Sequence, residues 1–358
     1  MNLIAYWRAA APRNCETLRE IAGRCGEPVT TLTPAAAVRY PLPAQAEAEM
    51  RGFLAPYCEL AVPPQGLVTL PGGRVYGPGV VIAPDDRSIA RDVSLDFGNA
   101  FDSHWLMSKR RLRNPRGRDE TVAVVAVRGG ETYYHWLLDE WPRLLSLGDT
   151  PFDSVVLHQT GFNAQALELF RRTRPAAALV AAGGGLHLRA SRLLVPELLG
   201  ESGHPAPRAL ELLEEFVQPL LDGAAPAAER IYVSRARARG RRVLNEDALW
   251  ARLEQRGFQR VFLEELDWPS QIRLFRQARV IVAPHGAGLA NLAFCRPGAK
   301  VLELFNRAYV HWCFWQLAAL RQLDYLPLAA AGAEPLSHTR SQSLADIEVD
   351  VDRVLASI

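Results

Sequence analysis

A histidine and two glycines follow a strongly apolar run in the C-terminal half of the chain. The segment VIVAP (280–284) predicts a buried β-strand, and His285-Gly286-Ala287-Gly288 then leads into a short predicted helix. Glycines let a ligand approach the backbone closely, and the free N–H groups at a helix start favour an anion. We therefore interpret this turn as a phosphate-binding site and expect His285 at its exposed lip. The alternative is that Gly-Ala-Gly only permits tight packing of strand against helix.

Arginines follow another predicted strand, IYVS (231–234). Guanidinium groups bind phosphate through paired hydrogen bonds and can take the place of a divalent cation beside a leaving diphosphate. We favour Arg235 and Arg242 for this role and expect Arg237 and Arg239 to face solvent. The alternative is a solvated basic loop, or a nonspecific patch for RNA or anionic lipid. The run also contains Arg241, and Asn245 after it is expected to cap the next helix.

A carboxylate interrupts the apolar strand KVLELF (300–305) at Glu303. Burying an unpaired carboxylate is costly, so Glu303 needs a partner. Hydroxyl groups of a bound ribose would serve, and a structural salt bridge to an arginine is the alternative.

A histidine and a carboxylate share a predicted helix in the N-terminal half, ETYYHWLLDEWPRLLSL (131–147). His135 and Asp139 are four residues apart and therefore lie on one helix face. Together they could accept a proton from an attacking hydroxyl. Glu140 is turned away by one step and is the weaker candidate. The alternative is that His135 and Asp139 only satisfy each other while the aromatic face of the helix packs.

Other chemical signatures are missing from the sequence. The only Asp-x-Asp pair, Asp350 and Asp352, lies near the C-terminus and reads as a charged face of a closing helix rather than a metal site. Together with the arginines, this favours catalysis without a metal or other cofactor. A G-x-S-x-G elbow, a Walker loop and a G-x-G-x-x-G fingerprint are absent. Gly183-Gly184-Gly185 lacks the helix that such a fingerprint needs.

Composition limits the classes of protein. The net charge of +2 gives no bulk support for a duplex nucleic-acid partner. The 5 cysteines are odd in number and show neither disulfide nor zinc spacing. The first residues have too short an apolar run for a signal peptide, and no stretch has the length of a membrane helix. We therefore expect a cytoplasmic protein that reaches a membrane only peripherally.

The elements that carry these residues form two α/β units. Residues 66–97 predict a small antiparallel meander, and strands then alternate with helices from Thr121 to about Ala182. A second alternation gives five parallel strands from Arg230 to about Leu328. A chain of 358 residues is longer than a single hydrophobic core usually supports. We therefore expect an acceptor-side domain at 1–205, a nucleotide-binding domain at 206–335 and a closing helix at 336–358. Sites in such sheets lie beyond the carboxyl ends of the strands.

In combination, these motifs resemble family-61 glycosyltransferases, the type associated with bacterial capsular-polysaccharide biosynthesis. The likeness extends over about residues 72–328, with the order and spacing of the motifs preserved. It rests on SRxxAxxRRVxN (234–245), PHGAGLAN (284–291), VLELF (301–305) and YYHWLLDEWPRL (133–144).

The resemblance implies a GT-B fold, in which two Rossmann-like domains face each other across a cleft, and a metal-independent, inverting reaction. Eukaryotic relatives use UDP-sugars, and bacterial relatives are associated with surface polysaccharides. By motif, Asp139 would be the base, assisted by His135, with Glu140 beside it. The nucleotide-sugar would be held by Ser234, Arg235, Arg241, Arg242, Asn245, His285, Gly286, Ala287, Gly288, Asn291 and Glu303.

Three hypotheses follow. The first is an inverting transfer of a hexose or pentose from a nucleoside-diphosphate sugar, with UDP favoured, to a glycan or glycolipid acceptor. The second is a catalytically inactive module that binds a nucleotide-sugar or a glycan. The third, a nucleotide-dependent epimerase, is disfavoured because the Tyr-x-x-x-Lys pair is missing and Lys109 and Lys300 are the only lysines. The sequence does not fix the oligomeric state.

Overall fold

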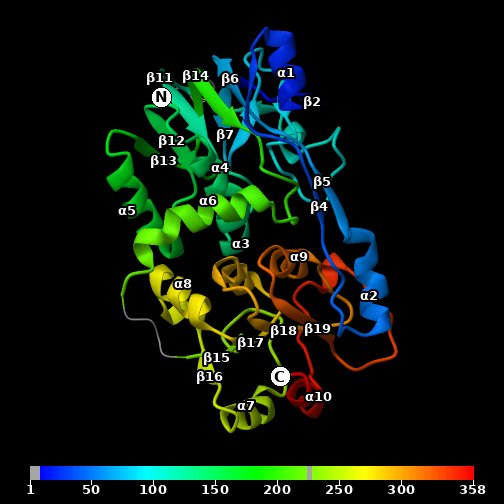
Figure 1. Cartoon of the computed structure of the whole chain (residues 1–358). Coiled ribbons are helices and arrows are strands. Elements are labelled where there is room, and N and C mark those ends of the chain that lie inside the picture. The colour runs from blue at the N-terminus through cyan, green and yellow to red at the C-terminus, as the bar shows by residue number, and fades with distance from the viewer. Residues whose placement is uncertain (1–8, 224–227) are drawn as a thin grey trace, which may run out of the picture. The chain divides into compact units, whose positions relative to one another are not determined.

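The chain forms two compact units in the computed structural model, which describes residues 9–223 and 228–358 (Figure 1). The first unit is Met1–Ala36 with Val62–Ser202, and the second is Ala37–Ala61 with Gly203–Ile358. This division differs from the boundaries expected from the sequence in two respects. Residues 37–61 fold with the second unit, and the C-terminal residues 336–358 are part of that unit rather than an addition to it.

Hydrogen bonds to one helix explain why residues 37–61 belong to the second unit. Nε1 of Trp315 in α9 (Cys313–Leu320) donates to the carbonyl of Pro41 at 3.0 Å, and Nε2 of Gln316 donates to that of Tyr57 at 3.0 Å. The ring of Tyr40 packs edge-on against Trp315, with the centroids 6.0 Å apart. The segment contains β4 (Ala36–Arg39), α2 (Ala48–Leu54), η2 (Ala55–Tyr57) and β5 (Glu59–Val62).

The first unit is built on a mixed sheet. Its parallel part has the spatial order β13 (Ala178–Ala181), β12 (Ser154–Leu157), β11 (Arg116–Val124) and β14 (His187–Pro196). The predicted parallel strands are therefore confirmed, but the sequence interpretation missed β14, the longest of them. Its polar residues Arg189, Ser191 and Arg192 interrupt the apolar run that marks a buried strand.

The predicted antiparallel meander is confirmed, and it continues the same sheet. β14 pairs antiparallel with β6 (Gln65–Pro71) and with β7 (Arg74–Tyr76), and β8 (Val80–Ile82) and β9 (Ser88–Ala90) follow. The remaining elements of this unit are β1 (Ala9–Ala10), β2 (Asn14–Glu16), α1 (Leu18–Cys25), β3 (Val29–Thr33), η3 (Trp105–Ser108), β10 (Arg111–Leu112), α3 (Tyr133–His135), η4 (Trp136–Glu140), α4 (Trp141–Ser146), η5 (Gly161–Asn163) and α5 (Ala164–Thr173).

The second unit contains the predicted parallel sheet. Within the described residues, its spatial order is β16 (Gln259–Val261), β15 (Arg230–Val233), β17 (Val280–Pro284), β18 (Lys300–Phe305) and β19 (Asp324–Ala329), with every neighbour parallel (Figure 1). The chain leaves β15 toward β16 on one side and leaves β17 toward β18 on the other. Such a reversal of direction opens a crevice at the carboxyl ends of the two strands, where ligands bind in sheets of this kind.

Helices connect these strands and cover the sheet. Besides α2 and η2, the α-helices described in this unit are α6 (Pro207–Val217), α7 (Glu246–Glu254), α8 (Trp268–Gln277), α9 and α10 (Val351–Ala356), and the 3₁₀ segments are η6 (Gln218–Leu220), η7 (Leu263–Glu265), η8 (Ala287–Phe294) and η9 (Arg340–Gln342). Both units therefore have the α/β architecture expected from the sequence. No helix in the described ranges has the length and apolar character needed to cross a bilayer.

The predicted closing helix is much shorter than expected. Ile347 forms a parallel bridge with Val243, so the chain before α10 is extended. The carboxylate of Asp350 accepts a hydrogen bond from the backbone N–H of Arg353 at 3.0 Å and so caps α10. Pairing with residue 243 fixes this segment as extended, and the helix begins only after its cap.

Candidate functional site

A cavity of about 360 Å³ opens at the crevice between β15 and β17. Residues from three successive loops line it, in agreement with the expected position of a site in such a sheet. They include Ser234, Arg235 and Arg237 after β15, Leu263 and Glu264 after β16, and Pro284 at the end of β17 with Gly286 and Gly288 after it. The arginine loop and the HGAG turn, which lie 50 residues apart in sequence, thus face one cavity.

Arg235 packs directly on the HGAG turn. A Cβ atom added at Gly286 would overlap Nη1 of Arg235, so a larger residue there would displace the guanidinium from its position. The backbone of Gly286 is extended and imposes no such requirement itself. Nη2 of Arg235 donates to the carbonyl of Gly240 at 3.0 Å. Burial and the charge of Arg241 lower the pKa of Arg235 to about 10, so it stays cationic at neutral pH.

Arg241 is a second cation that lacks a carboxylate partner. Its φ of 57° lies in the left-handed region, which is uncommon for arginine. Within the described chain, its Nε is buried without a hydrogen-bond partner, and neither Arg241 nor Arg235 forms an ion pair. Burial lowers the pKa of Arg241. The charge of Glu264, which lines the same cavity, attracts Arg235 without forming an ion pair with it. Two neighbouring guanidinium groups that form no ion pair repel each other and favour an anion between or beside them.

The structure places the other arginines differently from expectation. Arg242, one of the two favoured residues, is half-exposed and pairs with Asp346 at 2.6 Å, away from the cavity lining. Arg237, which was expected to face solvent, is exposed but also lines the cavity, where it pairs with Glu265 and lies 4.1 Å over the ring of Phe262. Arg239 is exposed, as expected. Arg237 therefore lines the cavity, and Arg242 does not.

His285 is buried, so the expectation of an exposed lip is wrong. The residue is 5 % exposed, its backbone N–H donates to Leu304 at 2.9 Å, and its Nδ1 lies 2.5 Å from Oε1 of Glu303. The hydroxyl of Tyr325 bonds the other oxygen of Glu303. Glu303 thus has a histidine and a tyrosine as partners, rather than the expected ribose or arginine.

Burial governs protonation in this cluster. It raises the pKa of Glu303 and that of Tyr325 well above their usual values. Burial, assisted by the charge of Arg241, lowers the pKa of His285 well below its usual value. All three shifts favour the uncharged forms of these side chains. The positive charge near the turn therefore comes from the arginines.

Three further motif residues have structural partners. Ser234 lines the cavity, and its hydroxyl donates to Glu246 at 2.5 Å. Asn245 occupies the position before α7 without making the expected capping bond, because its side chain bonds the backbone of Val349 at 2.7 and 3.1 Å. The amide of Asn291 is buried and donates to Gln271 at 3.0 Å and to the carbonyl of Gly288 at 3.1 Å. Ala287 is half-buried at the start of η8.

His135 and Asp139 meet in the first unit, as their spacing predicts. Nδ1 of His135 lies 2.7 Å from Oδ2 of Asp139. Both lie in one irregular helix, in which η4 is a π-helical segment between α3 and α4. The hydroxyl of Ser202, which the sequence interpretation did not single out, donates to the same carboxylate oxygen at 2.6 Å. The more exposed member is His135, with 24 % of its side chain exposed against 10 % for Asp139.

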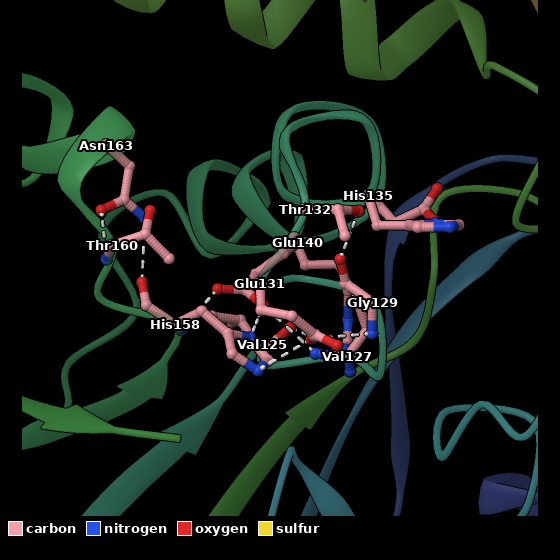
Figure 2. A network of polar contacts seen from close by, with 12 residues as sticks. Val125, Val127, Gly129, Glu131, Thr132, His135, Glu140, His158, Thr160 and Asn163 are labelled. Carbon is pink, nitrogen blue, oxygen red and sulfur yellow. Dashed lines mark hydrogen bonds and ion pairs between the residues drawn. The ribbon is translucent and has the colours of Figure 1, made fainter. Parts of the chain in front are cut away.

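Glu140 points away from His135 into a buried network (Figure 2). Its carboxylate is fully buried and accepts hydrogen bonds from the backbone N–H groups of His158 at 2.7 Å and Val127 at 3.2 Å. Nδ1 of His158 lies 2.6 Å from Glu140, and the carbonyl of His158 accepts from Asn163 at 2.9 Å. This geometry fits the expectation that Glu140 is the weaker candidate for a base.

His158 is a residue that sequence reasoning missed. It follows β12 directly, at the carboxyl edge of its sheet, as His285 follows β17. Burial acts to lower its pKa, but the hydrogen bond and the charge of Glu140 outweigh burial and raise the pKa. The position of a histidine immediately after an apolar strand is the signal that could have found it.

Among the described residues, no group of three histidine, cysteine, aspartate or glutamate side chains is placed to hold an ion. Asp350 caps α10, and Asp352 lies 3.4 Å from Arg252, so this pair is a charged feature of the last helix, as expected.

Comparison with known proteins identifies the class to which part of the chain corresponds. Residues 133–302 match the family model described as Glycosyltransferase 61, and this range contains the His135–Asp139 pair and the cavity at β15 and β17. A relative is the EGF domain-specific O-linked N-acetylglucosamine transferase of Drosophila melanogaster, 39% identical over 97 residues. The aligned part is 26% of this chain and spans only 18% of the relative's length. Both findings support the enzyme class of glycosyltransferases, which the motifs indicated.

Proposed function

We propose that this protein transfers a sugar from a nucleoside-diphosphate donor to a hydroxyl group of a glycan acceptor. The observation that carries the proposal is Arg235, which lines the crevice of a parallel sheet next to the charge of Arg241. Neither guanidinium forms an ion pair with a carboxylate in the described chain. A diphosphate supplies the charge that this pair lacks. The match of residues 133–302 to the glycosyltransferase family supports the same reading.

The donor is held through its diphosphate in this proposal. Arg235, Arg241 and the backbone N–H groups at the start of η8 donate hydrogen bonds to the phosphate oxygens. Their positive charge stabilises the leaving group as the bond to the sugar breaks. We therefore propose a transfer that needs no metal ion and inverts the anomeric centre, with UDP as the favoured nucleotide. The resemblance to the family is the support for inversion and for UDP.

The His135–Asp139 pair receives the acceptor proton. Nδ1 of His135 donates a hydrogen bond to the carboxylate of Asp139. In the neutral ring the proton is therefore on Nδ1, and the lone pair that can accept a proton is on Nε2. The acceptor hydroxyl gives its proton to Nε2 while its oxygen bonds to the anomeric carbon. The bond from that carbon to the diphosphate oxygen breaks, and its electron pair leaves with the nucleoside diphosphate. In this assignment His135 is the base and Asp139 orients it, whereas the motif alone favoured Asp139 as base.

The wider setting of the reaction is also part of the proposal. The GT-B arrangement and a role in bacterial surface polysaccharide synthesis rest on the resemblance. The proposed cytoplasmic location, with peripheral access to a membrane, rests on the composition of the sequence. The name of the Drosophila relative adds N-acetylglucosamine as a sugar to test first.

Thermal unfolding in the presence of donors tests this function. UDP-, GDP-, CMP- and dTDP-linked sugars are compared at equal concentration, with and without EDTA. A ligand that binds only the folded protein raises Tm by an amount that follows its affinity. We expect one class of nucleoside-diphosphate sugar to raise Tm, with no effect of EDTA, and the inorganic pyrophosphate control to raise it less. Absence of a shift with every donor would contradict the proposal. Binding without release of the nucleoside diphosphate in the presence of glycan acceptors would indicate an inactive module.

A further inference from the structure

An exposed phenylalanine lies against the ring of His135. The centroids of the Phe97 and His135 rings are 5.0 Å apart, and the ring planes are inclined by 32°. Phe97 is nevertheless 38 % exposed, so part of its ring is accessible to a ligand. Gly129 also packs on His135, because a Cβ atom there would lie 2.7 Å from Cδ2 of the imidazole. Phe97 lies outside the segment 133–302 that matches the family model.

Polar contacts fix the loop that carries Phe97. The guanidinium of Arg91 is buried and donates to backbone carbonyl groups along the whole loop. The acceptors are Ser94 at 3.1 Å, Asp96 at 3.0 Å, Asn99 at 3.3 Å and Ser103 at 3.1 Å. One side chain thus fixes the two ends of the loop, while residues 97–102 remain exposed.

Asp96 ties this loop to the segment that precedes His135. Its Oδ1 pairs with Arg128, the residue before Gly129, and its Oδ2 accepts from the N–H of Trp105 and from Asn99, each at 2.7 Å. Burial acts to raise the pKa of Asp96, but these hydrogen bonds and the charge of Arg128 hold it below its usual value. Asp96 is therefore ionised at neutral pH, and the Phe97 ring is held beside His135 by a charged anchor.

We propose that Phe97 is the platform on which a pyranose ring of the acceptor lies, with one of its hydroxyl groups at His135. The reaction in which this acceptor takes part rests on the proposed function. A pyranose has a face of C–H groups and an edge of hydroxyl groups. The negatively polarised face of an aromatic ring attracts the C–H groups. His135, Asp139 and Ser202 supply hydrogen-bonding groups beside that ring for the hydroxyl edge.

The surroundings of Phe97 favour a sugar over an apolar acceptor. Asn99 and Asp102 are exposed on the same loop, and Arg128 is partly exposed next to it. A lipid chain or an aromatic aglycone would remove these groups and the His135–Asp139 pair from water without replacing their hydrogen bonds, which is costly. A sugar ring can place its C–H face on the Phe97 ring and its hydroxyl groups against the polar side chains around it.

Saturation-transfer NMR with simple sugars tests the platform without any donor. The probes are methyl β-D-glucopyranoside, methyl β-D-galactopyranoside and methyl α-D-mannopyranoside, with cyclohexanol as an apolar ring of similar size. We expect at least one glycoside to receive saturation mainly at the C–H groups of one face, and cyclohexanol to receive none. Phe97→Ala is expected to reduce the signal at least fivefold and Phe97→Trp to keep it. Phe101→Ala is the matched control, since Phe101 is exposed on the same loop and no ring contact joins it to His135 within the described chain.

Each outcome bears on the platform separately from the proposed function. Lack of saturation with all three glycosides, or equal signals for wild type and Phe97→Ala, overturns the platform. A cyclohexanol signal that depends on Phe97 overturns it in favour of an apolar acceptor. If glycosides bind through Phe97 but no nucleotide-sugar raises Tm, the platform stands and the proposed transferase function fails. Circular dichroism of each variant shows that the fold is retained, as expected for substitution of an exposed ring.

Discussion

Asp139 Oδ2 accepts hydrogen bonds from two side chains, with Nδ1 of His135 at 2.7 Å and Oγ of Ser202 at 2.6 Å. The carboxylate is 10 % exposed and the histidine 24 %, so the histidine is the member that a substrate reaches more easily. Ser202 is the last residue of the first unit, 63 positions from Asp139, and no local pattern links them.

This relationship predicts the order of effects of three substitutions on turnover. Loss of a general base lowers kcat by about 10²–10⁴-fold, so we expect His135→Ala to fall in that range. Asp139→Asn should approach the same loss, because the amide no longer fixes the tautomer of His135. Ser202→Ala removes one hydrogen bond to a charged group and should lower kcat by about tenfold. Steady-state kinetics with the donor found by thermal shift measure these values. A His135→Ala variant with unchanged kcat would refute the assignment.

Arg241 and Arg242 are adjacent in sequence but should differ in donor binding. Arg241→Gln removes a cation that lacks a carboxylate partner in the described chain, and we expect the donor Kd to rise by about 10–100-fold. Arg242→Gln breaks an exposed ion pair with Asp346 and should change the Kd by less than about twofold. Calorimetric titration of both variants gives the comparison. Equal losses in the two variants would place the diphosphate elsewhere.

A side chain at position 286 should weaken donor binding only by displacing Arg235. The backbone conformation of Gly286 accepts a side chain, but its Cβ would overlap the guanidinium. We expect Gly286→Ala to weaken donor binding about as much as Arg235→Gln, with little change in Tm. The double variant should be no weaker than either single variant, since both remove the same contact. Additive losses in this double-mutant cycle would contradict the shared cause.

The buried pair Glu140–His158 should make stability depend on pH. Glu140 raises the pKa of His158 in the folded protein, so this interaction stabilises the fold fully below the pKa of an unfolded histidine, about 6.5. The contribution is lost as the pH rises through the higher folded pKa. Wild type should therefore lose more Tm between pH 6 and pH 9 than His158→Gln does. Parallel pH profiles for the two proteins would exclude the linkage.

Gly130 should be intolerant of a methyl group because of the same network. A Cβ atom at this position would overlap Oε2 of Glu140 and lie 2.5 Å from Nδ1 of His158. Overpacking of this kind costs about 1–3 kcal/mol of unfolding free energy. Gly161→Ala is the matched control, because no atom lies within 4 Å of a Cβ there. Chemical unfolding of both variants measures the difference. Equal unfolding free energies would show that the network accommodates the methyl group without loss of stability.

Local patterns predicted the elements of the fold well where the sheet is parallel and buried. The alternation of apolar strands and helices from Arg230 to about Leu328 was sufficient to predict each strand of the second sheet. Helical spacing likewise predicted that His135 and Asp139 meet. Both predictions depend on residues close together in sequence, whose geometry the backbone periodicity fixes.

Long-range pairing explains the predictions that differ from the structure. Residues 37–61 join the second unit because α9 donates hydrogen bonds to their carbonyl groups, and β14 lacks the uninterrupted apolar run of a buried strand. Asn245 bonds Val349 instead of capping α7, and the chain before α10 pairs with residue 243 instead of forming a helix. For residues 37–61, Asn245 and the chain before α10, the partner lies about 100 or more residues away, where sequence spacing carries no information. The miss of β14 instead reflects the polar residues within that strand.

The sequence by itself determined which residue types end the strands of the second sheet, and therefore that an anion site was to be expected at that edge. Only the tertiary structure decided which arginines lack a counter-ion, because Asp346 neutralises Arg242 while Arg235 and Arg241 form no ion pair within the described residues. It also decided that His285 is buried against Glu303, and that Phe97 lies on His135. Charge neutralisation and burial depend on which distant groups the fold brings within a few ångströms, and that is fixed by packing rather than by spacing along the chain.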